Sequence, residues 1–248
     1  MNADYETKVE RCKEKTAKAY ERASMIEGAT RIQYVESEAK IEGVDFVHIY
    51  VRKLVPKEWF INPAILPDIF FSQLGEIIAI GEKKHLIKQI IKNAKTEREA
   101  FTWNLDNLQK LVLGFMRTRI ARSGFSEPVI FIPIEKYVDV WTWRRRNKGF
   151  PVESEGKYDF LRFGNMRIPI FWSTKYYDFK NVMIVDKSFG TWIVKMGNYT
   201  KTLSIDIQPD ETDKERIDVS VRTVVNYRIN DPSAIKLLSP TQKSSTQI

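Results

Sequence analysis

A short apolar run closed by proline at both ends constrains the fold more than any other stretch of the chain. Pro128 and Pro133 flank the four residues Val-Ile-Phe-Ile. Proline interrupts both a helix interior and a central strand ladder, so a run this short and this apolar predicts a buried β-strand rather than a helical segment. The chain therefore contains a sheet with this strand inside it.

Helix and strand signals follow this run in quick succession. Residues 134–146 carry Tyr137, Val140 and Trp141 at three- and four-residue spacing, which predicts a helix with one face on a sheet, ending near Gly149. Short apolar or aromatic runs then recur, and each predicts a strand: residues 160–163, 168–172, 182–185 and 192–196. A strand, a covering helix and a series of strands predict an α+β fold.

The first half of the chain predicts more helix than strand. Residues 5–39 carry a thin apolar stripe and charges of both signs, which predicts a helix that must dock on a neighbour, either another subunit or its own domain. Residues 44–55 alternate in polarity and predict a strand. Residues 69–80 and 83–93 predict two further helices.

A capping box gives the clearest helix start. Thr96 and Glu99 have its spacing, Phe101 and four later apolar residues continue a helical stripe, and Gly124 offers a left-handed stop. Beyond the central strands, residues 202–207 and 216–229 predict a hairpin with a charged turn at residues 209–215. A short helix is expected from Asp231 through Leu238, and residues 239–248 form a polar tail without a partner.

Composition excludes several classes of protein. The 248 residues are 43% hydrophobic and 29% charged, which predicts a folded core. The sequence contains no run of about 18 uncharged apolar residues, the length that a membrane-spanning helix needs. The first residues lack an apolar signal core, so we expect a cytosolic protein. The single cysteine, Cys12, excludes an internal disulfide and a zinc knuckle. A net charge of +8 allows an anionic partner such as nucleic acid.

The motifs of common enzymes are missing from the sequence. The only two histidines, His48 and His85, have no adjacent cysteine or sharp serine turn, so we interpret both as structural. Neither GxxxxGK[ST] nor GxGxxG occurs, and the backbone cradle for nucleotide phosphates is therefore absent. We expect no enzymatic activity, no cofactor and no metal.

One pattern resembles the spacing of magnesium-dependent nucleases. Asp139, Glu155 and Lys157 could place two carboxylates on Mg²⁺ and a lysine beside the attacking water. Asp139 falls within a predicted helix, whereas Glu155 and Lys157 fall in or beside a predicted loop at residues 149–156. A spacing this permissive also occurs by chance.

A basic cluster follows two tryptophans at the end of the predicted helix. Arg144, Arg145, Arg146 and Lys148 favour the negative end of the helix dipole, so a solvated helix end is one interpretation. Contact with phosphates or with acidic residues of a neighbouring subunit is the other.

The order of these elements resembles a known family. The segments PVIFIP, IEKYVDVW, MRIPIFWS, NVMIVDK, TWIVK and RTVVNYRINDPSAIKLL succeed one another as in the tailed-phage major capsid fold of Hong Kong 97 type, which encapsulin shell proteins share. The resemblance covers roughly residues 96–238, and residues 56–93 do not map comfortably. It implies an N-terminal helical arm (1–43), peripheral strands and connecting helices (44–95), an A-domain-like core (96–200) and returning strands with a tail (201–248).

The resemblance implies a structural subunit that assembles with copies of itself into a closed icosahedral shell. The positive charge favours a virus capsid that encloses DNA, and an encapsulin that encloses a cargo enzyme is the alternative. A DNA-binding protein or a magnesium-dependent nuclease is the alternative of another class. The expected location is a virion or a cytoplasmic particle, neither secreted nor in a membrane.

Overall fold

The structure, a computed structural model, describes residues 3–62, 64–65, 67–94, 98–143, 149, 151–174 and 179–241. Its contacts divide the chain into two units, each made of segments that are not consecutive in sequence. Unit 1 comprises Met1–Ser24, Ile32–His85 and Trp192–Arg228, and unit 2 comprises Met25–Arg31, Leu86–Thr191 and Ile229–Ile248. The four-part division given above stays a prediction, because it concerns roles in a shell rather than contacts within one chain.

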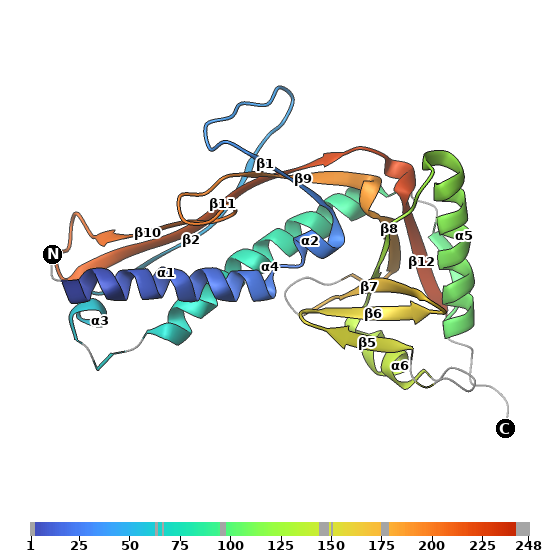
Figure 1. The fold of residues 1–248 in the computed structure, drawn as a ribbon, viewed down its shortest axis with the longest axis horizontal. Helices are drawn as coiled ribbons and strands as arrows, with labels where there is room; N and C mark the ends of the chain where they lie inside the picture. The colour runs from blue at the N-terminus through green and yellow to red at the C-terminus, as the bar shows by residue number, and fades with distance from the viewer. Residues whose placement is uncertain are drawn as a thin grey trace. The chain divides into compact units, whose positions relative to one another are not determined.

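Unit 1 is built around the long strand β11 (Arg216–Ile229), with which three other strands pair. These are β10 (Ser204–Pro209), β2 (Val47–Pro56) and β9 (Gly190–Lys195), and β9 pairs in turn with β1 (Arg31–Val35). The antiparallel register places Ile205 opposite Val221, and Val221 opposite Val51. The predicted strand at 44–55 and the predicted hairpin are therefore confirmed (Figure 1).

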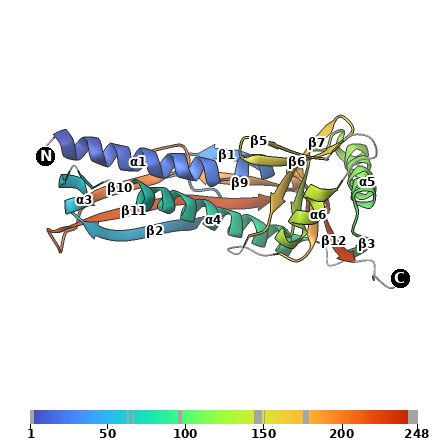
Figure 2. The same ribbon diagram turned by 90° about the horizontal axis from the view of Figure 1, so that it is seen from below.

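One face of this sheet is covered by helix α1 (Ala3–Ala23) and by the part of α4 (Asp68–Asn93) up to His85, and α4 then continues into unit 2. The short helix α3 (Glu58–Ile61) precedes α4 in sequence. Both long helices run along the strands in Figure 2. Their apolar side chains share one core with the inward residues of β2, β10 and β11, including Tyr20, Phe71, Ile78, Ile205 and Val219.

Unit 2 holds a second sheet, in the order β3-β12-β8-β4-β7-β6-β5. The strands are β3 (Arg98–Thr102), β4 (Pro128–Ile132), β5 (Val152–Glu155), β6 (Tyr158–Phe163), β7 (Met166–Trp172), β8 (Val182–Asp186) and β12 (Ile235–Thr241). Helices α2 (Ile26–Ala29), α5 (Leu105–Ser123) and α6 (Tyr137–Thr142) accompany it, with single 3₁₀ turns η1 (Ile134–Lys136), η2 (Lys187–Phe189) and η3 (Pro232–Ala234).

Strand β4 is buried along its whole length, as its apolar sequence predicts. Ile130 and Ile132 belong to the core that α5 and α6 contribute to, whereas Phe131 packs against Phe171 and Phe179. Gly28 of α2 lies close against Phe171, because a Cβ atom added to this glycine would stand 3.1 Å from the Phe171 ring. Both faces of β4 are therefore covered by other side chains, which explains why apolar and polar residues do not alternate along this strand.

The predicted helix over residues 5–39 is wrong beyond Ala23. The chain turns through α2 and then forms β1, which pairs with β9. Isolated propensity favours helix across these residues, but pairing along β9 satisfies the backbone groups of β1 and overrides it. Helix α1 docks on its own unit, which was one of the two alternatives considered.

The two predicted helices at 69–80 and 83–93 are one continuous helix, α4. Gly81 lies inside this helix, and a Cβ atom there would meet Ile49 Cγ2 at 2.5 Å. The glycine allows a close approach to β2 instead of ending the helix.

The capping box prediction is wrong, and Thr96 itself lies outside the described residues. Glu99 and Phe101 belong to β3, which pairs in parallel with β12. Helix α5 begins at Leu105, after Asn104, whose side chain accepts a hydrogen bond from the Asn107 N–H at 2.8 Å. Its predicted end is confirmed, since Gly124 has φ +79° and its N–H donates to Ile120 O.

Three further corrections concern strand ends and short helices. The predicted helix at 134–146 is the turn η1 followed by α6, which ends at Thr142. Part of the predicted loop at 149–156 is strand β5. The predicted helix after Asp231 is only the turn η3, and residues 235–241 form β12 between β3 and β8. Ser239 and Thr241 of the predicted free tail therefore pair with β3.

Candidate functional site

The predicted basic cluster cannot be placed. Arg144, Arg145, Arg146 and Lys148 all lie outside the described residues. Their proposed contact with phosphates or with a neighbouring subunit stays a prediction.

The residues of the nuclease pattern are each engaged elsewhere. Asp139 accepts a hydrogen bond from the Trp103 indole at 3.0 Å, and Glu155 pairs with Arg167. Lys157 lies over the Tyr158 ring, 5.3 Å from its centroid. Over the described part of the chain, no group of three or more His, Cys, Asp or Glu could hold a metal ion. Each of the three side chains of the nuclease pattern therefore has a partner outside the pattern.

The two histidines and the cysteine lie in different surroundings. His48 is an exposed residue of β2, and the His85 ring packs edge-on against Trp192 at 5.6 Å. Cys12 is buried in unit 1, and burial raises the pKa of its thiol to about 12. A thiol that stays protonated is a poor nucleophile.

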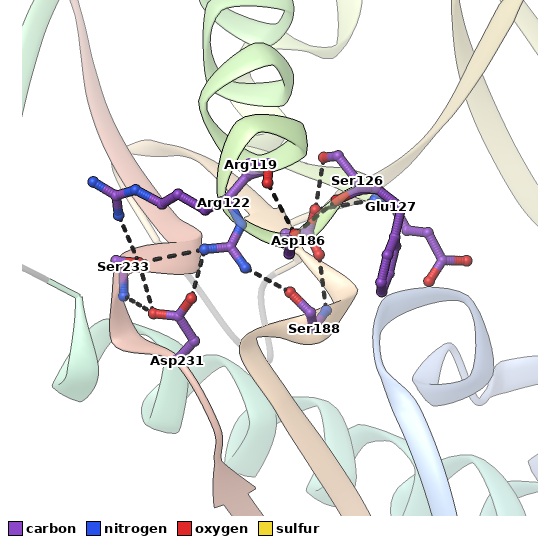
Figure 3. Close-up of polar contacts among 10 residues, drawn as sticks. Arg119, Arg122, Ser126, Glu127, Asp186, Ser188, Asp231 and Ser233 are labelled. Carbon is purple, nitrogen blue, oxygen red and sulfur yellow. Dashed lines mark hydrogen bonds and ion pairs between the residues drawn. The ribbon is translucent and has the colours of Figure 1, made fainter.

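The most connected polar cluster of unit 2 surrounds Arg119 (Figure 3). This arginine continues the buried face of α5 and is only 3% exposed. Its Nη1 donates to Asp231 Oδ2 at 2.5 Å, and its Nη2 donates to Ser188 Oγ at 2.9 Å. Three segments therefore meet at one guanidinium group: the end of α5, the turn η2 and the turn η3.

Each carboxylate of this cluster also caps a turn. Asp231 accepts from the N–H and the hydroxyl of Ser233, and Asp186 accepts from the N–H groups of Ser188 and Glu127. Desolvation opposes ionisation of both carboxyls. Hydrogen bonds outweigh this desolvation and hold the pKa of each carboxyl below its ordinary range. Asp231 accepts them from Ser233 and Arg119, and Asp186 accepts them from Ser126 and Ser188.

The chemistry of this cluster is that of a brace. A charged arginine whose two terminal nitrogens donate to a carboxylate and a hydroxyl offers neither a base nor an activated nucleophile. The sequence carried a signal for it that was missed: Arg119 continues the spacing of Leu108, Val112 and Phe115, and a cation on an apolar stripe needs a buried partner.

A second buried carboxylate lies in unit 1. Glu82 of α4 is 0% exposed, and its Oε2 accepts a hydrogen bond from the Tyr20 hydroxyl of α1 at 2.8 Å. Burial raises the pKa of Glu82 to about 8, although the bonds from Tyr20 and Ser24 and the charge of Lys83 lower it. Glu82 and Tyr20 join α1 to α4.

One acidic exposed segment is the loop between β1 and β2, residues 36–46, here named the acidic loop. It holds four carboxylates and one lysine: Glu36, Glu38, Glu42, Asp45 and Lys40. Figure 1 shows it extending away from the strands that carry it. Its backbone bonds are local turns, Ala39 N–H to Glu36 O and Val44 N–H to Ile41 O, and only its end is tied, by Asn226 to Asp45 O.

The described surface also carries a hollow of about 580 Å³ in unit 1, where β2 meets the β10–β11 turn. Its charged lining has both signs, and Arg52 is neutralised by two-pronged hydrogen bonds to Asp218. Among the described residues, no helix combines the length and the apolar character needed to cross a membrane.

Compared by sequence, the chain matches no protein-family model and no curated protein. Compared by structure, it is similar to the virus-like particle from Pyrococcus furiosus, with a TM-score of 0.61 and 11% identity over 93% of this chain and 98% of that chain. The encapsulin SrpI from Synechococcus elongatus PCC 7942 gives a TM-score of 0.59 and 13% identity over 85% and 84% of the two chains. The bacteriophage PhiM1 mature capsid gives 0.56 and 10% over 88% and 87%.

These likenesses define the fold. The chain has the Hong Kong 97-type fold of phage capsids and encapsulin shells, and the α+β class and the family resemblance predicted from the sequence are confirmed. The match extends well beyond residues 96–238, because only 7% of the chain lies outside the first of these alignments.

Proposed function

We propose that this protein is a shell subunit that assembles with copies of itself into a closed icosahedral particle. The observation that carries the proposal is the fold match along nearly the full length of both chains in the comparison with the virus-like particle. Sequence identity near 10% leaves the assembled state to be tested on this chain.

Two features of the described residues support association rather than catalysis. The ionisable groups of the Arg119 cluster, Arg119, Asp186 and Asp231, are committed to holding turns. The acidic loop projects, and among the described residues its partners outside its own turns lie at its end, where Asn226 bonds Asp45 O and the Lys195 ammonium lies over the Phe46 ring. In a shell with five-fold and six-fold axes, a projecting segment meets an adjacent copy through a heterologous contact that the rotation closes.

Regarding the contents, we favour nucleic acid and therefore a virus or provirus capsid. The net charge of +8 supports this choice, because a basic chain lowers the repulsion between packed phosphates. An encapsulin with a protein cargo is the second candidate, supported by the likeness to the SrpI encapsulin at a TM-score of 0.59.

Electron microscopy of the purified chain tests the proposal. We expect closed, uniform hollow particles in negative stain. Nuclease digestion followed by extraction then identifies the contents, protected nucleic acid supporting a capsid and a folded co-purifying enzyme supporting an encapsulin. A preparation containing only small, well-dispersed single subunits at high concentration would contradict the shell proposal.

A further inference from the structure

The C-terminal half of helix α4 presents three evenly spaced lysines to solvent. Lys84, Lys88 and Lys92 are all exposed and follow one another at four-residue spacing, here named the lysine face. Four residues of α-helix turn through slightly more than one full turn and rise about 6 Å, so the three side chains lie in one row about 12 Å long.

Among the described residues, no carboxylate forms an ion pair with this row. The sequence contains no Asp or Glu between Glu82 and Glu97, and Glu82 itself is fully buried. The nearest exposed acid earlier on the helix, Glu76, is eight residues before Lys84, or about 12 Å along the axis. Within the described residues, no ion pair or hydrogen bond engages any of the three ammonium groups.

Some cations elsewhere in the chain form ion pairs. Exposed or buried, they face carboxylates of the same chain: Arg11 and Lys15 with Asp68, Arg52 with Asp218, Arg119 with Asp231, Arg162 with Glu153, and Lys236 with Glu99. The lysine face therefore concentrates unneutralised positive charge in one row, and its field adds rather than cancels.

We propose that the lysine face is a contact surface for the phosphate backbone of nucleic acid. This inference rests on the proposed shell function and identifies which surface of the subunit meets the contents. Lysine binds phosphate as a point charge without reading bases, so the contact is independent of sequence. A row about 12 Å long runs beside about three to four nucleotides of one strand, whose phosphates are spaced about 3.4 Å along the duplex axis.

The composition of the row favours nucleic acid over a segment of another protein. The buried centre of a protein interface is depleted in lysine and enriched in aromatic residues and arginine. Residues 83–93 contain four lysines, no arginine and no Phe, Tyr or Trp. The acidic loop of a second copy is the competing occupant, and the experiment separates the two.

The test compares the full-length chain with two triple variants of equal charge. The first, Lys84→Gln, Lys88→Gln and Lys92→Gln, removes the lysine face. The second, Lys53→Gln, Lys110→Gln and Lys214→Gln, removes three exposed lysines from β2, α5 and the β10–β11 turn. Glutamine and lysine have similar helix propensity and all six sites are exposed, so both variants should fold.

Two measurements are made on each protein: nuclease-protected nucleic acid per particle, and affinity of dissociated subunits for a short fluorescent duplex DNA as salt rises. We expect the lysine-face variant to form particles with about tenfold less nucleic acid. For this variant, the slope of the logarithm of DNA affinity against the logarithm of salt concentration should be shallower by about 2.7. Between about 50 and 200 mM salt, its affinity should therefore fall about 40-fold less than that of the wild type. The control variant should match the wild type.

The other outcomes overturn the inference. Equal nucleic acid and equal salt slopes in all three proteins mean that the lysine face does not contact phosphate. Loss of particles in the lysine-face variant alone, with unchanged DNA affinity, assigns the row to a contact between copies. If the wild type forms no particles, the shell function fails, whereas the salt slopes still decide whether these lysines bind DNA.

Discussion

The carbonyl oxygen of Thr16 lies 2.2 Å from the point where a Cβ atom on Gly75 would stand. Helices α1 and α4 therefore meet backbone to backbone at this point. The Thr16 hydroxyl donates to Phe71 O at 3.1 Å, one turn earlier on α4. This crossing explains how a helix with few apolar residues docks on its own unit.

Replacing Gly75 with alanine should open this crossing. The added methyl group can only be accommodated if the helices separate, because the opposing atom is backbone and cannot rotate away. We expect a loss of about 1–3 kcal/mol in the free energy of unfolding, measured by urea denaturation.

The matched control is Gly114→Ala, in the exposed interior of α5, where a Cβ meets nothing within 4 Å. Helix propensity alone should stabilise that variant by about 0.5–1 kcal/mol. Equal effects at the two glycines would show that the α1–α4 crossing is not tightly packed.

Glu82 should make unit 1 less stable as the pH rises. Its pKa is raised to about 8 from 4.5, so within that window the folded state binds a proton that the unfolded state has released. Stability then falls by about 1.4 kcal/mol for each pH unit across the window and is level above it.

Glu82→Gln keeps the shape and removes the titration. Unfolding curves recorded from mildly acidic to mildly alkaline pH should lose this decline, and the variant should be the more stable protein at the alkaline end. Parallel pH profiles for wild type and variant would place the Glu82 titration outside this range.

The Arg119 cluster should be sensitive to loss of its carboxylate. Asp231→Asn leaves a guanidinium that is 3% exposed without its counter-charge, so we expect unfolding to be easier by about 3 kcal/mol. Glu153→Gln, which breaks the solvent-accessible pairs with Arg162 and Arg167, should cost about 1 kcal/mol or less. A small effect at Asp231 would mean that solvent reaches the guanidinium.

Neutralising the acidic loop should weaken assembly without affecting folding. Glu36→Gln, Glu38→Gln and Glu42→Gln remove three exposed charges that make no described ion pair within the chain. We expect light scattering to show a lower fraction of large particles than for Glu58→Gln, Glu135→Gln and Glu211→Gln. Equal assembly of the two triple variants would show that the charges of the acidic loop do not contribute to contacts between subunits.

Strands with strong local signals could be predicted from the sequence, whereas choices made by distant pairing could not. β4 has proline at both ends and an unbroken apolar run, and the hairpin of β10 and β11 alternates around a charged turn. The sequence patterns of β1, β3 and β12 are weaker, and these segments become strands because they find pairing partners. β1 pairs with β9, β3 pairs with β12, and β12 also pairs with β8. Propensity favoured helix at each of these places, and tertiary pairing overrode it.

The site was harder to predict than the fold. The brace at Arg119 requires residues separated by 112 positions in sequence, and no local motif joins Arg119 to Asp231. The lysine face is visible as a carboxylate-free stretch, but the burial of Glu82 and the exposure of the lysines depend on which side of α4 faces the sheet. A single sequence does not specify that side.

The mass of the purified wild-type chain in solution tests the central claim most directly. Multi-angle light scattering on the size-exclusion peak should give one narrow species whose mass is a large multiple of 29.1 kDa, as a closed shell requires. A species at 29.1 kDa that persists unchanged as the protein is concentrated would contradict it.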